Sequence, residues 1–333
     1  ADQRRIPLLS LGLTYDLRAD YLAQGWGEEE TAEFDRPDTV EGIEEALANL
    51  GYRTERIGNI FSLVKALNGG RRWDMVFNIC EGFAGMGREA QVPALLDAYS
   101  IPYTFSDPLV LALCLHKGLT KTIVRAAGVP TPDFRVLQDP EEAKSLGLPS
   151  PLFIKPVAEG TGKGITALSK VEESALLPER VEAMLQRFNQ PVLVETFLPG
   201  REFTVGLVGT GKEARVLGVM EILLRDGAEK DAYTFENKEK FQGRVNYEAV
   251  GGKEAELCAE VALKAWRALG CRDGGRLDLR MDERGIPNFL EVNPLAGLNP
   301  TISDLPILCG LHGISYQSLV EMIMESALKR VSR

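Results

Sequence analysis

The stretch GGRLDLRMDERGIPNFLEVN, residues 274–293, has the pattern of two β-strands joined by a turn. Apolar and polar residues alternate on both sides of the sequence Asp-Glu-Arg-Gly, which is typical of an antiparallel hairpin. Residues two apart in a strand point to the same side of the sheet, so Arg276 shares a face with Asp278, and Glu291 shares a face with Asn293. If the hairpin register brings these pairs together, Asp278, Glu291 and Asn293 converge as oxygen ligands of the kind that Mg²⁺ prefers.

A second interpretation of the same hairpin needs no metal. Charged residues often cover the solvated outer face of an antiparallel sheet by default. The apolar residues of the hairpin predict one buried face but do not say what the other face meets; they are Leu277, Leu279, Leu290 and Val292. Both interpretations stay open on the hairpin alone.

The composition indicates a soluble globular protein with more than one subdomain. A chain of 333 residues is too long for one ordinary core and suits two or three subdomains. The formal net charge of -10 argues against nucleic acid or an anionic membrane as the main partner. We find no apolar segment of the signal-peptide kind and no apolar run of spanning length, so we expect a cytoplasmic protein.

The cysteines and histidines argue against several kinds of site. The five cysteines have no Cys-x-x-Cys spacing, which favours reduced, buried thiols over a disulfide framework or a zinc site. The chain has two histidines, so a histidine-based metal site or a Ser/His/Asp triad is not expected.

The order of strand and helix patterns predicts three units. Residues 1–107 alternate strands and helices, with a buried strand at 6–13 and a helix at 38–51, which is typical of a parallel sheet. Residues 108–195 form a smaller mixed unit, and residues 196–333 form a third. The expected fold class is therefore α/β in the first unit and α+β in the other two.

Several elements inside these units can also be predicted. Asp38 is placed to cap its helix, and the sequence from 107 to 128 has the pattern of one continuous helix. The segments 201–209 and 215–223 are expected to pair as antiparallel strands. The polar, aperiodic segment 230–250 is expected to be a long loop.

Two lysines and a glycine-rich loop suggest phosphate binding. The loop VAEGTGKGI, residues 157–165, offers backbone N–H groups to a phosphate, with Lys163 inside it. Alone it is a weak signal, because it matches neither GxxxxGK[ST] nor a GxGxxG that opens a helix, and a flexible turn is an equal alternative. Lys155 ends an apolar strand, where a lysine either snorkels or meets an anion. Lys117 lies on a predicted helix, where a surface position is the default.

Taken in order, these motifs resemble the ATP-grasp superfamily, and in particular the D-alanine–D-alanine ligase family. The resemblance covers residues 95–333. The segments that carry it are DPLVLALCLHKGLTK at 107–121, PLFIKPVAEGTGKGI at 151–165, VLVETFLPGREFTV at 192–205 and GRLDLRMDERGIPNFLEVNPLAG at 275–297. It implies an ATP-grasp fold in which the second and third units clamp ATP, behind an N-terminal parallel-sheet substrate domain, with 230–250 as a lid.

The resemblance also implies a nucleotide site. In the implied nucleotide site, Lys117 and Lys155 would contact the α- and β-phosphates of ATP, and Glu202 would hold the ribose hydroxyls. Glu195 or a backbone carbonyl accepts from the exocyclic amine of adenine, and a backbone N–H meets a ring nitrogen. The residues of the adenine slot are Glu195, Thr196, Phe197 and Leu198, and the phosphate loop contributes Thr161, which stands where the family has a serine, and Gly162.

A metal and reaction centre is implied beside it. Two Mg²⁺ ions, or Mn²⁺, would be bound by Asp278, Glu291 and Asn293, with Glu291 bridging. Arg276 and the backbone N–H of Gly297 would stabilise an oxyanion, which explains the tight turn after Asn293. Two further residues match the family: Lys238, which approaches the γ-phosphate from the lid, and Ser303, which binds the second substrate's carboxylate after a one-residue insertion.

The activity implied by the resemblance is an ATP-dependent ligase that forms an amide bond. Its partners would be a small-molecule carboxylate and an amine, both amino acids in the family, and the protein would be a homodimer. A carboxylate is a poor electrophile, so the γ-phosphoryl group is first transferred to make an acylphosphate, and water must be excluded from it. A kinase that stops at phosphoryl transfer and a non-catalytic nucleotide-binding protein are the alternatives.

The substrate half departs from the family. No GGxSxE-type motif follows the first strand, Glu81-Gly82 stands where the family has His-Gly, and Glu239 stands at the aromatic lid position. Carboxylates in the N-terminal unit can replace these groups by holding an ammonium, and arginines can hold a carboxylate. The candidates are Tyr15, Asp16, Arg18, Glu33, Asp35, Glu81, Arg88 and Glu89, and a solvated loop is an equal alternative for each.

Overall fold

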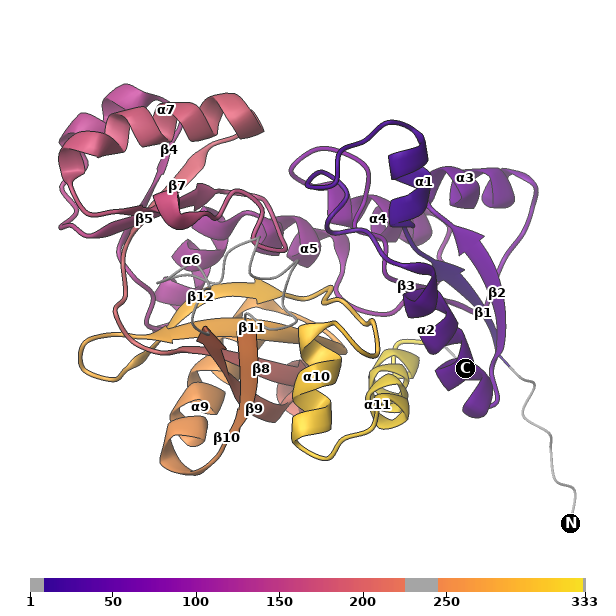
Figure 1. The fold of residues 1–333 in the computed structure, drawn as a ribbon. Helices are drawn as coiled ribbons and strands as arrows, with labels where there is room; N and C mark the ends of the chain where they lie inside the picture. The colour runs from indigo at the N-terminus through magenta and orange to yellow at the C-terminus, as the bar shows by residue number, and fades with distance from the viewer. Residues whose placement is uncertain (1–8, 225–244, 332–333) are drawn as a thin grey trace, which may run out of the picture.

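The computed structural model describes residues 9–224 and 245–331, which form three sheets with flanking helices (Figure 1). In Figure 1 the N-terminal sheet lies at the right, a four-stranded sheet at the upper left and a five-stranded sheet below it. Within the described ranges, no helix is both long and apolar enough to cross a membrane.

The N-terminal sheet is parallel throughout, as the strand–helix alternation predicts. Its strand order is β2-β1-β3. Its elements are β1 (Ser10–Thr14), α1 (Arg18–Ala23), α2 (Pro37–Asn49), β2 (Arg53–Gly58), α3 (Ile60–Asn68), β3 (Met75–Asn78), the 3-10 turn η1 (Arg88–Ala90) and α4 (Gln91–Ala98). The strand expected at 6–13 is observed from Ser10, and its first residues lie outside the described ranges.

The predicted cap of helix α2 is wrong. The N-cap is Arg36, not Asp38. Pro37 takes the first helical position, because its fixed φ suits a helix and its missing N–H would have no partner there. Asp38 instead lies in the first turn, where a negative charge favours the positive end of the helix dipole.

The helix expected from 107 to 128 is broken in two. Helix α5 (Pro108–Leu115) and helix α6 (Lys117–Ala126) meet at His116, whose backbone is extended. The Nδ1 atom of His116 accepts a hydrogen bond from the backbone N–H of Leu119 at 3.1 Å, so the side chain caps α6. The break starts a new helix at Lys117, with its amide bonded to the carbonyl oxygen of Val157 at 2.9 Å.

The four-stranded sheet is antiparallel, with the order β4-β7-β5-β6. Its strands and longest helix are β4 (Phe134–Leu137), β5 (Leu152–Pro156), β6 (Lys170–Val171), β7 (Val192–Thr196) and α7 (Leu177–Phe188), and its 3-10 turns are η2 (Pro140–Ser145), η3 (Ala167–Ser169) and η4 (Ser174–Leu176). Lys155 and Glu195 lie on its neighbouring strands β5 and β7.

The five-stranded sheet is antiparallel, with the order β10-β9-β8-β11-β12. Its elements are β8 (Glu202–Val208), η5 (Gly211–Glu213), β9 (Arg215–Leu224), β10 (Val245–Val250), α9 (Gly252–Leu269), β11 (Gly274–Met281) and β12 (Pro287–Asn293). The predicted pairing of β8 with β9 and the predicted hairpin of β11 with β12 are both confirmed.

The long loop expected at 230–250 is wrong at its end. Residues 245–250 form strand β10, which pairs antiparallel with β9 from Val245 to Val250. The backbone hydrogen bonds between β10 and β9 outweigh the polar composition of the segment. Residues 230–244, with Lys238 and Glu239, lie outside the described residues.

The C-terminal helices join the third unit to the first. Helices α10 (Asp304–Leu311) and α11 (Tyr316–Leu328) lie between the five-stranded sheet and the N-terminal sheet (Figure 1). Buried side chains from both sides form one apolar cluster, in which Leu319 and Ile323 join Leu11 and Ile43. The cluster fixes the hairpin relative to the N-terminal sheet. The boundaries after residues 107 and 195 stay a prediction.

Candidate active site

The hairpin register brings its polar side chains together. Asp278 lies opposite Glu291, and Arg276 lies opposite Asn293. The register shifts between Asp278 and Leu279, because β12 carries one extra residue there. That residue is Leu290, so the expectation that it faces the core is wrong. Leu290 and its neighbour Glu291 both line a cleft on the polar side of the hairpin.

Charged groups of the chain surround these carboxylates. The guanidinium of Arg276 pairs with Asp278, whose Oδ1 accepts from the hydroxyl of Thr204 at 2.9 Å. The Nζ atom of Lys117 lies 3.3 Å from Glu291. Burial opposes the charge of Arg276, but the nearby carboxylates outweigh it and raise the pKa of Arg276.

The donor set of the hairpin suits a hard cation. Among the described residues, no group of three or more His, Cys, Asp and Glu side chains forms a metal site by itself. Asp278, Glu291 and Asn293 instead offer two carboxylates and one carboxamide on paired strands. Mg²⁺ accepts such a partial set, because it keeps waters and takes further oxygens from phosphates. The residues present therefore fit magnesium, and its binding here is a prediction.

Two buried lysines share one carboxylate beside the hairpin. The carboxylate of Glu195 lies 3.0 Å from Nζ of Lys155 and 2.9 Å from Nζ of Lys121. Burial opposes the charge of each group. The two lysines outweigh it and lower the pKa of Glu195, and Glu195 with Glu291 raises the pKa of Lys155. For Lys121 burial prevails and lowers its pKa to about 8.

Lys121 was not expected from the sequence. It follows Lys117 by four residues on α6, and this spacing sets two side chains on one face of a helix. This spacing is the feature of the sequence that could have identified Lys121 as part of the site. Its Nζ also donates to the hydroxyl of Thr131 at 2.6 Å, so this buried ammonium has two polar partners.

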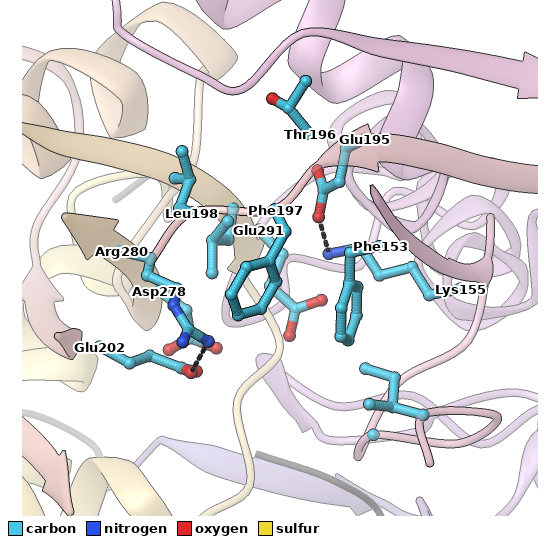
Figure 2. Close-up of a pocket in the computed structure, with 13 residues that line it drawn as sticks. Phe153, Lys155, Glu195, Thr196, Phe197, Leu198, Glu202, Asp278, Arg280 and Glu291 are labelled. Atoms are coloured by element: carbon cyan, nitrogen blue, oxygen red, sulfur yellow. Dashed lines mark ion pairs between the residues drawn. The ribbon is translucent and has the colours of Figure 1, made fainter. Parts of the chain in front are cut away.

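The hairpin cleft, as we call the cleft bordered by Leu290 and Glu291, has apolar walls and charged ends (Figure 2). The rings of Phe153 and Phe197 face it with centroids 6.2 Å apart. The guanidinium of Arg280 lies 4.7 Å from the Phe197 ring and 3.6 Å from Glu202. Lys155 lies at the opposite side from Glu202 (Figure 2), so the predicted ribose and phosphate ligands border one cleft.

Two backbone N–H groups of the predicted adenine slot already donate hydrogen bonds within the protein. The N–H of Thr196 donates to Asp133 and the N–H of Phe197 donates to Pro151, at 2.9 and 3.0 Å. Because the Glu195 side chain is held by two lysines, a backbone carbonyl is the better acceptor for an adenine amine. Leu198, the last residue of the slot, also lines the cleft.

The glycine-rich loop is tied to the N-terminal unit. The N–H of Gly160 donates to Glu33 at 2.7 Å, and a Cβ added at Gly160 would lie 2.5 Å from that carboxylate. Lys163 lies 3.5 Å from Glu33 and 3.3 Å from Glu159. Thr161 and Gly162 follow with φ of +54° and +73°, which turns the loop between the hairpin cleft and a second pocket.

This second cavity, the acidic pocket, lies where the three units meet. Its lining residues include Glu33, Glu81, Glu89, Lys117, Thr161, Arg276, Glu291 and Asn293. Glu291 borders both cavities, so the polar face of the hairpin stands at their junction. Gly297 and Ser303 line neither cavity but lie together, since a Cβ added at Gly297 would be 2.8 Å from the Ser303 hydroxyl.

The N-terminal candidates separate into two groups. Glu33, Glu81 and Glu89 line the acidic pocket, whereas Asp16 is buried and accepts from the N–H of Gly82 at 3.0 Å. Arg88 donates twice to Glu33, at 3.1 and 3.0 Å, so it braces the pocket wall. Tyr15, Arg18 and Asp35 are not among the residues that line this pocket.

Comparison with known proteins gives one consistent result. The family model for the D-ala D-ala ligase C-terminus matches residues 123–325. A D-alanine--D-alanine ligase of Methylobacterium radiotolerans is 34% identical over 293 residues, which cover 85% of this chain and 90% of that protein. An uncharacterized protein of Sinorhizobium fredii, y4sG, is 35% identical over 261 residues, or 77% of this chain and 75% of that one.

Solved structures agree with the expected fold. A D-alanine--D-alanine ligase from Bacillus anthracis complexed with ATP has a TM-score of 0.71 at 22% identity, covering 96% of this chain and 98% of that chain. The VanG D-Ala:D-Ser ligase from Enterococcus faecalis has a TM-score of 0.73 at 20% identity, covering 96% and 99%. The predicted ATP-grasp fold is thereby confirmed.

Proposed function

The chain belongs to the D-alanine–D-alanine ligase family, and from that premise we propose that it is an ATP-dependent ligase. It joins the carboxylate of one small molecule to the amine of another. The observation that carries this proposal is the junction at Glu291, where the hairpin cleft opens beside the acidic pocket. A nucleotide in the cleft and a carboxylate in the pocket would meet there.

The roles of the nucleotide residues follow from their positions around the cleft. Phe153, Phe197 and Leu290 offer an apolar slot for a base, and Glu202 an acceptor for ribose hydroxyls. Lys155 and Lys117 supply positive charge beside the hairpin, which offsets the charge of a triphosphate. Lys121 keeps Glu195 neutralised when Lys155 turns to a phosphate.

Magnesium held by Asp278, Glu291 and Asn293 would offset the charge of the transferring phosphoryl group. In the first step a carboxylate oxygen bonds to the γ-phosphorus, the bond to the β-γ bridging oxygen breaks, and ADP leaves. In the second step the amine nitrogen bonds to the acyl carbon, loses a proton, and phosphate leaves. Arg276, which lines the acidic pocket, and the backbone N–H of Gly297, an exposed residue, would stabilise the oxyanion between these events.

Incubation with Mg²⁺-ATP and pools of amino acids in both configurations tests the proposal. We expect ADP and phosphate in equal amounts with an amide product, and D-alanine belongs in the pools because the relatives' names include it. Hydroxylamine added in place of the amine should trap the acylphosphate as a hydroxamate. A stable phosphorylated product would indicate a kinase instead, and ATP binding without turnover in any pool would indicate a nucleotide-binding protein.

A further inference from the structure

The acidic pocket contains two carboxyl groups that the proposed ligation chemistry does not use. Glu81 follows strand β3, and Glu89 lies in the 3-10 turn η1, so one loop supplies both. Both line the pocket on the side of the N-terminal unit, and Lys117, Arg276 and Glu291 line it from the other units. The pocket therefore has an acidic wall facing the reaction centre.

The other acidic groups nearby already have cationic partners. Glu33 binds Arg88 at 3.0 Å, and Glu159 lies 3.6 Å from Arg88 and 3.3 Å from Lys163. Lys117 is engaged by Glu291 and by the carbonyl oxygen of Glu159. Across the described part of the chain, neither Glu81 nor Glu89 has a lysine or arginine within salt-bridge distance.

Burial makes this lack of a cation costly. Glu89 is only 7% exposed, and its carboxyl group hydrogen-bonds that of Glu81, which requires a proton between them. Burial raises the pKa of Glu89 to about 7, with Arg88 opposing and Glu33 adding to the shift. Burial and then Glu89 raise the pKa of Glu81 well above its usual range. A buried carboxyl pair in this state favours a cation that can replace the proton.

The backbone holds the two carboxyl groups in position. Gly82 has φ of +85°, and a Cβ added there would lie 2.0 Å from the carbonyl oxygen of Arg88, so the two ends of the loop touch. Asp16 accepts from the N–H of Gly82, and Arg88 also donates to the carbonyl oxygen of Ala158 at 3.1 Å. A rigid loop loses little entropy when a ligand binds.

We propose that Glu81 and Glu89 bind the ammonium group of the substrate whose carboxylate is activated at Glu291. This assignment rests on the proposed ligase function and adds to it the residues that would select an ammonium group on the activated acid. The activated acid carries an ammonium group, which donates hydrogen bonds to both carboxylates and accepts none. A substrate with a hydroxyl in place of the ammonium would leave the buried carboxylates without a countercharge.

Binding without turnover tests the assignment. Isothermal titration calorimetry with Mg²⁺ and ADP present would be run for each common amino acid in both configurations. The tightest-binding amino acid would then be compared with its 2-hydroxy analogue. We expect the wild-type protein to bind the amino acid at least about tenfold more tightly, since a hydrogen bond between charged groups contributes that much. Equal affinities, or no binding of any amino acid, would overturn the assignment.

Two variants and one control locate the effect. In Glu81→Gln and Glu89→Gln we expect the preference for the ammonium compound to fall to about threefold or less, with the affinity of the hydroxy analogue little changed. Glu45→Gln removes the same charge from an exposed position on α2 and should keep the full preference. A preference that survives in both pocket variants would also overturn the assignment. If amino acids bound as expected but no amide formed, the ligase proposal would be wrong and the assignment of Glu81 and Glu89 would stand.

Discussion

The hairpin cleft and the acidic pocket share Glu291 but neutralise their carboxyl groups differently. In the cleft, each carboxylate has a cation of the chain beside it: Asp278 has Arg276, Glu291 has Lys117, Glu195 has Lys121 and Lys155, and Glu202 has Arg280. In the pocket, Glu81 and Glu89 have each other. The charges of the cleft carboxylates are balanced by the chain before a ligand binds. The carboxyl groups of the pocket gain a cationic partner only from a ligand.

This difference matches what each ligand brings. A nucleotide with magnesium carries both signs of charge, so a site for it works best with matched pairs that can exchange partners. An amino acid brings its own ammonium, so the wall that receives it needs unmatched carboxylates. The predictions below test the two regions separately, beginning with the largest expected effect.

Glu291→Gln tests the junction between the two regions. The amide keeps the shape of the side chain but removes the charge that a metal and Lys117 both need. We expect turnover to fall by about a thousandfold or more, with the fold intact. Steady-state ADP release with the best amino-acid substrate measures it, and circular dichroism checks the fold.

A matched control lies on the same hairpin. Glu283→Gln removes a charge from the exposed turn between β11 and β12, at a residue that lines neither cavity, and should leave turnover within about threefold. Turnover near the wild-type rate in Glu291→Gln would defeat the metal assignment.

Lys155→Ala tests the cleft alone. It removes one of the two cations beside Glu195, while Lys121 remains 2.9 Å from that carboxylate and preserves the fold. We expect kcat/KM for ATP to fall by roughly a hundredfold, because a charge-assisted contact to a phosphate is lost. The ranking of amino-acid substrates should not change.

Lys144→Ala is the control for this variant. Lys144 is exposed and pairs with Glu141 at 2.6 Å on the surface, where such pairs contribute little. A Lys155→Ala protein that used ATP normally but preferred a different amino acid would show that Lys155 belongs to the acidic pocket.

The two regions also differ in how far the sequence predicted them. The metal trio lies in one hairpin, so alternation alone indicated which side chains share a face. The bulge at Leu290 was not predicted, because the alternation of apolar and polar residues does not reveal one extra residue in a strand. The break between α5 and α6 at His116 was not predicted either. The helical apolar pattern continues across His116, and the cap of α6 depends on a nitrogen of its imidazole ring.

The acidic pocket was harder to predict because its parts are distant in the chain. Glu33 joins Arg88 across 55 positions, and Gly160 joins Glu33 across 127. The sequence marked these residues as candidates by type and position. It did not show that Arg88 would be engaged by Glu33 while Glu81 and Glu89 would lack a cation, because that depends on how distant segments of the N-terminal unit pack.

Glu89→Gln gives the smallest effect and the most direct test of the unbalanced pocket. Burial raises the pKa of Glu89 to about 7; Arg88, the bond from Glu81 and the charge of Lys117 lower it, and Glu33 raises it. A carboxyl whose pKa is raised on folding is protonated in the folded state and ionised in the unfolded state between the two pKa values. Its contribution to stability is complete below the unfolded value, near 4.3, and is lost as pH rises through about 7.

Glutamine has no proton to lose, so the variant escapes this penalty. We expect the free energy of unfolding of Glu89→Gln, relative to wild type, to increase by about 3 kcal/mol between pH 4.5 and pH 8, as a folded-state pKa of about 7 implies. Urea unfolding without ligands at the two pH values measures it, with Glu45→Gln on the surface of α2 as the variant that should show no such change. If the difference between variant and wild type were the same at both pH values, Glu89 would be ionised in the folded protein throughout, and the pocket would hold its charge without needing a cation from the substrate.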